Sequence, residues 1–256
     1  MTALPGSYAV VVPTIGRPSL RLLLAQLVSG VGCSGTQRHS RVVVVDDRPL
    51  SYAQPLPLPE GMPIQVLRSG GRGPAAARNV GWRAVHTEWV AFLDDDVVPE
   101  AGWAARLAED LDDAAGLPEV GASQGRIEVP LPTDRRPTDF ERGTAGLASA
   151  RWITADMAYR RVALQRVGGF DERFGRAYRE DADLALRVIA AGYRIVEGRR
   201  RTMHPVRPAS PLASVRAQRG NADDVLMRRK HRTGWRERIG DGPGRLRGHA
   251  LTTAAA

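Results

Sequence analysis

Residues 89–99 read WVAFLDDDVVP, an apolar run that leads into three adjacent aspartates, Asp94, Asp95 and Asp96. The run has the length and composition of a buried strand. Three neighbouring carboxylates repel one another unless a cation or hydrogen-bond donors offset their charge. Hard oxygen ligands at a strand end suit Mg²⁺ or Mn²⁺ held together with substrate phosphates. The stretch predicts a metal site, with an acidic turn that caps the next helix as the alternative.

Strand and helix patterns alternate around this stretch. Short apolar runs occur at residues 8–12, 41–45 and 64–67, and helical patterns at residues 19–28, 74–85 and 103–111. Such alternation predicts an α/β fold, with a mostly parallel sheet flanked by helices. Ligands of open α/β sheets bind beyond the carboxyl ends of the strands, which is where the aspartates fall.

Two further features of the first half suit a bound nucleotide. The acid pair Asp46-Asp47 ends the valine-rich run, where a carboxylate can accept hydrogen bonds from a ribose or a base. It can equally bond to its own turn. Residues 70–79 form a glycine-rich loop that enters a helix and lets the backbone approach a phosphate. The loop matches neither the Walker nor the dinucleotide-binding pattern, so by itself it predicts only a turn.

The second half is less regular. We expect strands at residues 122–129, 152–159 and 193–196, helices at residues 161–167, 180–191 and 212–227, a mobile loop at residues 130–150 and disorder at residues 240–256. Glu180 and Asp181 open one of these helices, a position that acids favour on electrostatic grounds alone. His204 is a lone histidine after the last strand, which by itself is more often structural than a ligand.

The charge of the 256 residues is unevenly placed. The net charge is +9, yet residues 199–256 hold 14 Arg or Lys and 4 Asp or Glu. We therefore divide the chain into a domain at 1–206 and a basic, helical or disordered extension at 207–256. A basic extension favours anionic partners, including peripheral contact with the inner face of a membrane. Nucleic acid is disfavoured, because no tyrosine or phenylalanine is interleaved with the tail arginines.

Two other properties bear on the compartment. The chain has one cysteine and no run of roughly 20 apolar residues that could cross a bilayer. We expect a cytoplasmic protein on these grounds.

Six motifs in order resemble the family 2 glycosyltransferases, which have a GT-A fold with a Rossmann-like sheet. The resemblance covers residues 7–205. The motifs are Val10-Val11-Val12-Pro13-Thr14, the acid-pair strand at 42–47, the Ala-Arg-Asn stretch at 73–81, the Asp-x-Asp strand at 91–99, the Gly-Gly-Phe-Asp stretch at 167–172 and the Glu-Asp stretch at 180–184. One departure is Val97, where many relatives carry a fourth acid.

The resemblance implies an inverting, metal-assisted transfer of a sugar from a nucleotide-diphosphate sugar to an acceptor. The acceptor class stays open between a lipid-linked molecule, a polysaccharide and a small molecule. The implied roles are a nucleoside pocket of Thr14, Asp46 and Arg78, a ribose contact from Asp94, a Mn²⁺ or Mg²⁺ site of Asp96 and His204, a catalytic base at Asp181 and an orienting acid at Glu180.

Two other functions compete with this interpretation. A sugar-phosphate nucleotidyltransferase would carry a Gly-rich signature with Arg and Lys after the first strand, where this chain has Pro13-Thr14 and no lysine. A non-enzymatic binding module would act through the basic tail. The run Arg199-Arg200-Arg201 lies shortly before His204, so we expect part of the basic cluster beside the donor phosphates.

Overall fold

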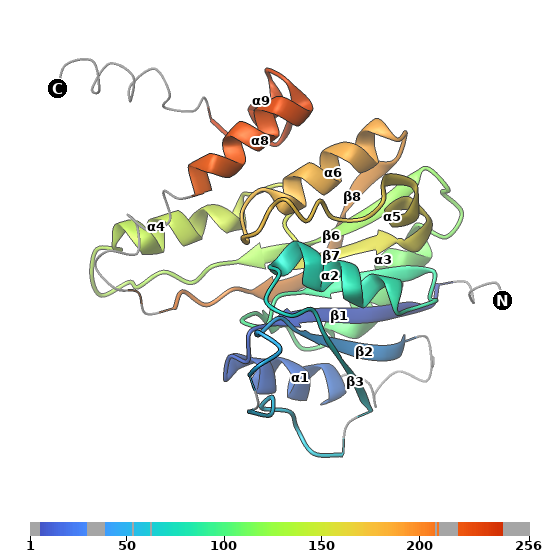
Figure 1. The fold of residues 1–256 in the computed structure, drawn as a ribbon, viewed down its shortest axis with the longest axis vertical. Helices are drawn as coiled ribbons and strands as arrows, with labels where there is room; N and C mark the ends of the chain where they lie inside the picture. The colour runs from blue at the N-terminus through green and yellow to red at the C-terminus, as the bar shows by residue number, and fades with distance from the viewer. Residues whose placement is uncertain are drawn as a thin grey trace.

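The computed structural model describes residues 6–29, 39–52, 54–61, 63–207, 209 and 220–242, and one sheet organises them (Figure 1). In the described part of the chain the sheet has eight strands in the order β3-β2-β1-β4-β7-β6-β8-β5. The strands are β1 (Tyr8–Thr14), β2 (His39–Asp46), β3 (Ile64–Arg68), β4 (Trp89–Leu93), β5 (Val98–Pro99), β6 (Val120–Glu128), β7 (Asp156–Arg160) and β8 (Arg194–Met203).

The strand directions divide the sheet into two halves. Strands β3, β2, β1 and β4 are parallel neighbours, as expected of strands joined through helices. Strand β7 runs antiparallel to both β4 and β6, while β6 and β8 pair in parallel. Because β7 is reversed, it begins at the sheet edge where β4 ends. The predicted α/β fold with a mostly parallel sheet is confirmed.

Helices cover both faces of the sheet, and the alternation of side chains along β1 shows why. Tyr8, Val10 and Val12 pack with leucines of α1 (Ser19–Ser29) and α3 (Trp103–Asp113). The intervening Ala9 and Val11 pack on the other face with α2 (Pro74–Arg83), α5 (Arg161–Val167) and α6 (Glu180–Ala190). Both faces of the central strands are therefore apolar, as in buried parallel sheets.

The segment expected to be a mobile loop at 130–150 contains helix α4 (Asp139–Ala145) and a 3₁₀ turn, η1 (Gly146–Ala148), so that expectation is wrong there. A capping box begins the helix. Thr138 Oγ1 accepts from Glu141 N at 3.2 Å, and Glu141 Oε2 accepts from Thr138 N at 2.7 Å. The Thr-x-x-Glu spacing is a sequence signature of a helix start.

The described part of the basic extension is helical and packed. Helices α8 (Asn221–His231) and α9 (Trp235–Arg238) place Met227 and Trp235 in an apolar cluster with Leu186 of α6. Residues 212–219 of the expected helix and residues 243–256 of the expected disordered end lie outside the described residues. The division at residue 206 stays a prediction. Among the described helices, none has the length and apolar character to span a bilayer.

Candidate functional site

A cavity of about 420 Å³ opens beyond the carboxyl ends of β1 and β4. Its walls come from segments that are far apart in the sequence. Seven of the eight predicted site residues line it, namely Thr14, Arg78, Asp94, Asp96, Glu180, Asp181 and His204. The sheet edge therefore brings together side chains from β1, α2, the end of β4, the start of α6 and the end of β8.

The three consecutive aspartates have different surroundings. Asp95 is buried, accepts a hydrogen bond from Thr14 Oγ1 at 2.6 Å and forms an ion pair with Arg17. Burial raises the pKa of Asp95 above its usual range, although the Arg17 charge opposes the rise. Asp95 therefore fixes the turn after β4 against the end of β1. Sequence reasoning assigned no role to Asp95 or Arg17.

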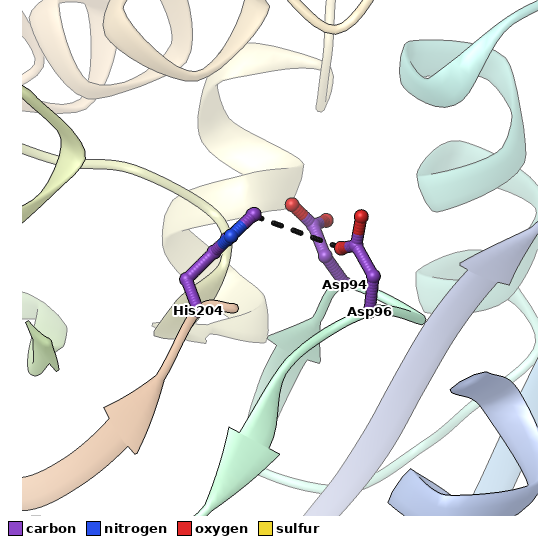
Figure 2. A group of neighbouring side chains, drawn as sticks. All are labelled: Asp94, Asp96 and His204. Atoms are coloured by element: carbon purple, nitrogen blue, oxygen red, sulfur yellow. Dashed lines mark ion pairs between the residues drawn. The ribbon is translucent and has the colours of Figure 1, made fainter. Parts of the chain in front are cut away.

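The flanking aspartates, Asp94 and Asp96, lie close to His204 (Figure 2). One ligand atom from each of Asp94, Asp96 and His204 lies within 4.8 Å of the others. His204 Nε2 is 3.7 Å from Asp96 Oδ1, and Arg207 Nε is 3.1 Å from Asp96 Oδ2. Two carboxylates and an imidazole suit Mn²⁺ or Mg²⁺. The donor set therefore fits a divalent cation, with Arg207 as a neighbouring charge that sequence reasoning missed.

Arg78 connects the aspartate segment to α6. Its side chain is 2% exposed, with Nη2 at 2.8 Å from Asp94 Oδ1 and Nη1 at 2.9 Å from Glu180 Oε1. Burial disfavours the Arg78 cation, but the charges of Asp94 and Glu180 outweigh burial and raise its pKa above the usual range. Within the described residues, Arg78 Nε and Glu180 Oε2 are buried without a hydrogen-bond partner. Such unsatisfied buried atoms are rare in structural networks.

The two acids at the start of α6 differ in access. Glu180 is buried against Arg78, whereas Asp181 is partly exposed and lines the cavity. Asp181 Oδ1 accepts from Ala182 N at 2.7 Å, and its carboxylate forms no salt bridge among the described residues. Burial raises the pKa of both acids, and the charge of Asp181 adds to the rise at Glu180. Asp181 is the acid that is free to exchange a proton with a molecule in the cavity.

The two acids at the end of β2, Asp46 and Asp47, differ in whether they line the cavity. Asp46 does not line the cavity, and its carboxylate accepts hydrogen bonds from Arg48 Nε and Arg48 Nη2, each at 2.8 Å. Burial alone would raise the pKa of Asp46, but the bonds from Arg48 outweigh it and lower the pKa. Asp47 does line the cavity. The nucleoside role of Asp46 stays a prediction.

Asp47 also holds the glycine-rich loop. Its Oδ1 accepts from Ser69 Oγ at 2.7 Å and from Arg72 N at 3.0 Å, and its Oδ2 accepts from Gly73 N at 2.8 Å. Gly73 has φ +95, and a Cβ there would lie 2.6 Å from Gly175 O. Only glycine permits this approach of the two loops, which continue into the cavity-lining residues Pro74 and Ala177.

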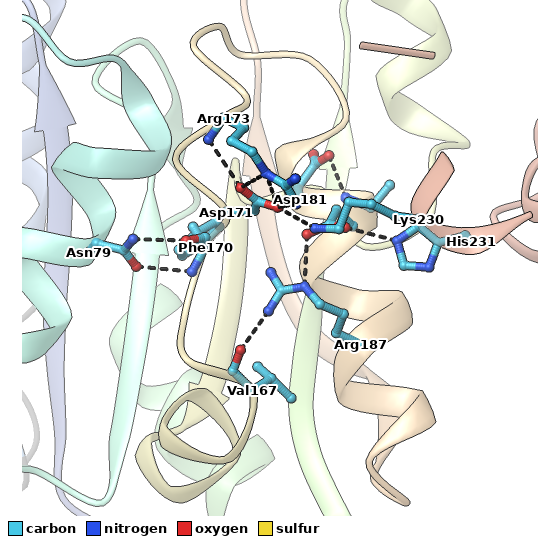
Figure 3. A network of polar contacts seen from close by, with 11 residues as sticks. Asn79, Val167, Phe170, Asp171, Arg173, Asp181, Arg187, Lys230 and His231 are labelled. Carbon is cyan, nitrogen blue, oxygen red and sulfur yellow. Dashed lines mark hydrogen bonds and ion pairs between the residues drawn. The ribbon is translucent and has the colours of Figure 1, made fainter. Parts of the chain in front are cut away.

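The Ala-Arg-Asn and Gly-Gly-Phe-Asp motifs support the site from behind (Figure 3). Asn79 exchanges two hydrogen bonds of 2.9 Å with the backbone N–H and C=O of Phe170.

Asp183 of α6 is fully buried and lies 2.6 Å from Lys230 Nζ and 2.8 Å from His231 Nε2 of α8. Burial would raise the pKa of Asp183, but these groups and Arg187 lower it. Helix α8 is thus ion-paired to α6, the helix that carries Asp181.

The expectation that Arg199-Arg200-Arg201 lies beside the donor phosphates is wrong. Arg199 pairs with Asp113 at 2.6 Å and Arg201 with Glu128 at 2.8 Å, both on the surface. Arg200 is fully buried and binds Asp110 and Asp156. None of the three arginines lines the cavity, where Arg17, Arg78 and Arg207 are the basic residues. The pleat of β8 turns successive side chains to opposite faces, which separates the three.

Comparisons with known proteins agree with this geometry. The model of the family described as glycosyl transferase family 2 matches residues 9–183. Pre-mycofactocin glycosyltransferases from two strains of Mycobacterium tuberculosis are 33% identical to the chain over 176 residues. The match covers 62% of this chain and 36% of theirs, so the chain spans about a third of the length of these relatives.

Solved structures show the same fold at lower identity. Mannosyltransferase PcManGT from Pyrobaculum calidifontis, in complex with GDP-Man and Mn²⁺, has a TM-score of 0.56 and 22% identity, covering 86% of this chain and 64% of its own. S. aureus TarS 1-349 in complex with UDP has a TM-score of 0.53 and 20% identity, covering 86% of this chain and 65% of its own. The predicted GT-A fold is confirmed.

Proposed function

The chain belongs to glycosyl transferase family 2, and from that premise we propose that it transfers a sugar from a nucleotide-diphosphate sugar to an acceptor hydroxyl, with inversion at the anomeric carbon. The observation that carries the proposal is the placement of Asp181. Its partly exposed carboxylate lines the same cavity as the Asp94, Asp96 and His204 group. A general base and a site for the leaving diphosphate must share one cavity for a single-step displacement.

The reaction follows from these placements. The Asp181 carboxylate takes the proton of the acceptor hydroxyl, and the acceptor oxygen forms a bond to the anomeric carbon. The bond from that carbon to the diphosphate oxygen breaks on the opposite side, and its electron pair leaves with the nucleoside diphosphate. Burial raises the pKa of Asp181, which makes its carboxylate a stronger base once it is ionised.

Asp94, Asp96 and His204 would hold a divalent cation, with Mn²⁺ and Mg²⁺ as the candidates. When bound, the cation neutralises the negative charge that develops on the leaving diphosphate. PcManGT has been solved with GDP-Man and Mn²⁺, and the TarS fragment with UDP, which supports a nucleotide-sugar donor for this chain. Arg207, next to Asp96, would add a positive charge on the phosphate side.

Donor-side roles follow the position of each residue around the cavity. Thr14 and Arg78 would line the nucleoside pocket, and Asp94 would reach the ribose. Asp47 is a second candidate for the nucleoside contact, since it lines the cavity and Asp46 does not. Glu180, held by Arg78, would orient the acceptor end of the site through the start of α6.

A donor screen tests the proposal. Thermal shift and donor hydrolysis would be measured across UDP-, GDP- and dTDP-sugars, each with Mn²⁺, Mg²⁺ or EDTA. We expect one donor class to stabilise the protein and to be hydrolysed slowly, with both effects reduced by EDTA and by Asp96→Asn. Wild-type turnover by Asp96→Asn in EDTA would exclude metal assistance. Pyrophosphate release from a sugar phosphate and a nucleoside triphosphate would instead identify a nucleotidyltransferase.

The tail gives a narrower basis for membrane contact than its composition suggests. In the basic run at residues 228–230, Lys230 is ion-paired with Asp171 and Asp183. Arg228 and Arg229 are therefore the exposed basic side chains of this run. We therefore test peripheral contact with Arg228→Ala/Arg229→Ala, which leaves the packing of α8 intact. Co-sedimentation with anionic but not neutral vesicles, lost in this variant and at high salt, would support an acceptor at a membrane surface.

A further inference from the structure

The cavity has one wall that the donor chemistry does not use. The charged and hydrogen-bonding residues described above belong to the strand ends, to α2 and to α6, with Arg17 and Arg207 beside them. The other wall contains Phe140, Thr144, Leu147, Ile153, Ala155 and Pro205, none of which can ionise. The charged side of the cavity accounts for the donor diphosphate, which leaves this apolar surface for a second occupant.

Helix α4 presents this wall with one face. Phe140, Thr144 and Leu147 follow one another at spacings of four and three residues, which places them on a single stripe. The Thr144 hydroxyl donates to the Phe140 carbonyl at 3.0 Å, so its polar atom is satisfied within the helix. On the other faces, the side chains of Asp139 and Arg142 are 80% and 57% exposed.

Phe140 and Thr144 of α4 are not used to build the core. No residue of α4 is buried, and Phe140 is absent from the apolar clusters formed by the described residues. Leu147, Ile153 and Ala155 do join the cluster that includes α1 and α3. The wall is therefore an extension of the core surface into the cavity, with the Phe140 ring at its outer end.

The topology assigns this wall to the acceptor. Thr14 ends β1 and Asp47 directly follows β2, in the parallel half of the sheet. Helix α4 comes between β6 and β7 in the chain and lies beside the other half of the sheet (Figure 1). Asp181 lines the same cavity and has no ion pair among the described residues to restrain it. A molecule lying against α4 would therefore present its hydroxyl to the base.

We propose, on the basis of the function proposed above, that the acceptor is an alcohol or phenol whose hydroxyl adjoins an aromatic or aliphatic group, seated against Phe140, Leu147 and Ile153. A polyhydroxylated sugar would lose hydrogen bonds to water on this wall, where the hydroxyls of Thr144 and Thr154 are the polar groups that the side chains offer. An apolar group gains from the same burial. The transfer itself balances as before, with the acceptor proton passing to Asp181.

The test compares acceptors at fixed donor. With the donor that gives the largest shift in the screen, transfer to benzyl alcohol and cyclohexylmethanol is compared with transfer to glycerol and methyl glucoside. We expect kcat/KM to be higher for the two apolar alcohols by at least about tenfold, the size of effect that a small apolar group has in a pocket. Equal or better transfer to the polar acceptors would overturn the proposal.

Variants of Phe140 locate the effect. Phe140→Ala should raise KM for benzyl alcohol about tenfold, and Phe140→Leu should restore most of the loss. Leu22→Ala, at an exposed leucine of α1, is the matched control. An unchanged KM in Phe140→Ala would contradict the proposal. Donor binding and hydrolysis by the wild type distinguish failure of this acceptor proposal from failure of the proposed glycosyl transfer. Their absence would contradict the glycosyl transfer itself.

Discussion

Two buried arginines each bridge two carboxylates, but the two groups differ in how completely their polar atoms are hydrogen-bonded. Arg200 lies between Asp110 and Asp156, and Arg78 lies between Asp94 and Glu180. We call the first group, with Ser123, Thr202 and Trp103, the closed network. We call the second, with Asp181, the open network.

The closed network satisfies its polar atoms. Arg200 donates to Asp156 Oδ1 at 2.7 Å, to Asp110 Oδ2 at 2.9 Å and to the Ser123 carbonyl at 2.6 Å. Asp156 Oδ2 accepts from Trp103 Nε1 and Thr202 Oγ1, both at 2.6 Å. A Cβ on Gly125 or Gly198 would collide with these carboxylates at 2.5 Å or less, so glycine makes the room.

The open network lacks this completeness. Arg78 Nε and Glu180 Oε2 have no partner among the described residues, and Glu180 and Asp181 both have a pKa raised first by burial. Buried charges that are fully paired define a fold, whereas charges left incomplete beside a cavity are typical of sites. The comparison teaches that burial of charge alone does not locate function; incomplete pairing next to space does.

The largest effect should come from breaking the closed network. Arg200→Met leaves Asp110 and Asp156 buried without their cation, which we expect to lower the free energy of unfolding by about 3–5 kcal/mol. Urea denaturation followed by circular dichroism measures it. Arg201→Met, on the exposed face of β8, is the control and should cost little. Equal stability of Arg200→Met and wild type would refute the structural role of the network.

Asp181→Asn should separate activity from stability in the open network. We expect kcat to fall about 100-fold or more, while donor affinity stays near that of the wild type. Because the folded state disfavours the Asp181 charge, the variant should be as stable as the wild type or more stable at pH 8. Asp113→Asn, at an exposed acid, is the control for charge removal. A variant that loses donor binding but keeps its rate would point to a helix cap.

Lys230→Met tests a third group of buried charges, at the contact between α8 and α6. Asp183 keeps His231 and Arg187 in this variant, so the loss should be modest, about 1–2 kcal/mol in the free energy of unfolding. Turnover should fall less than in Asp181→Asn. Arg229→Met, the exposed neighbour, serves as the comparison in the same denaturation series. Wild-type stability in Lys230→Met would mean that α8 is held by its apolar contacts alone.

The smallest effect is a pH dependence that distinguishes the two networks. Glu180 and Asp181 have folded-state pKa values above their unfolded values, so the folded state binds more protons between the two. Stability contributed by these acids is complete below about pH 4, the unfolded range, and is lost as pH rises through the raised pKa. Turnover should change in the opposite direction, rising as Asp181 ionises.

Glu180→Gln isolates this effect. Plots of unfolding free energy against pH should be flatter for Glu180→Gln than for the wild type between the unfolded and folded pKa values of Glu180. Asp156→Asn, in the closed network, should lower stability. An unchanged pH slope in Glu180→Gln would show that Glu180 titrates in its ordinary range.

Much of the site was predictable because it consists of strand ends. Apolar runs followed by acids located β2 and β4, and an apolar run followed by Pro13-Thr14 located β1. Parallel strands bring their carboxyl ends to one edge. Helix α4 was not predicted because a stripe of three residues that faces a cavity gives too short a helical pattern. The Thr-x-x-Glu spacing of its capping box was present in the sequence. The Arg199-Arg200-Arg201 run misled because a run of like residues hides the two-residue period that buries only Arg200.

Helix α4 begins at its own capping box and is tied by Arg135 to Glu141, and it buries no side chain. Substitutions there carry almost no folding penalty, unlike substitutions at Arg200 or Asp156. In evolutionary terms, the half of the cavity proposed for the acceptor can drift while the half proposed for the donor stays fixed. A directed library confined to residues 139–148 would sample new acceptors from a population of variants that nearly all fold.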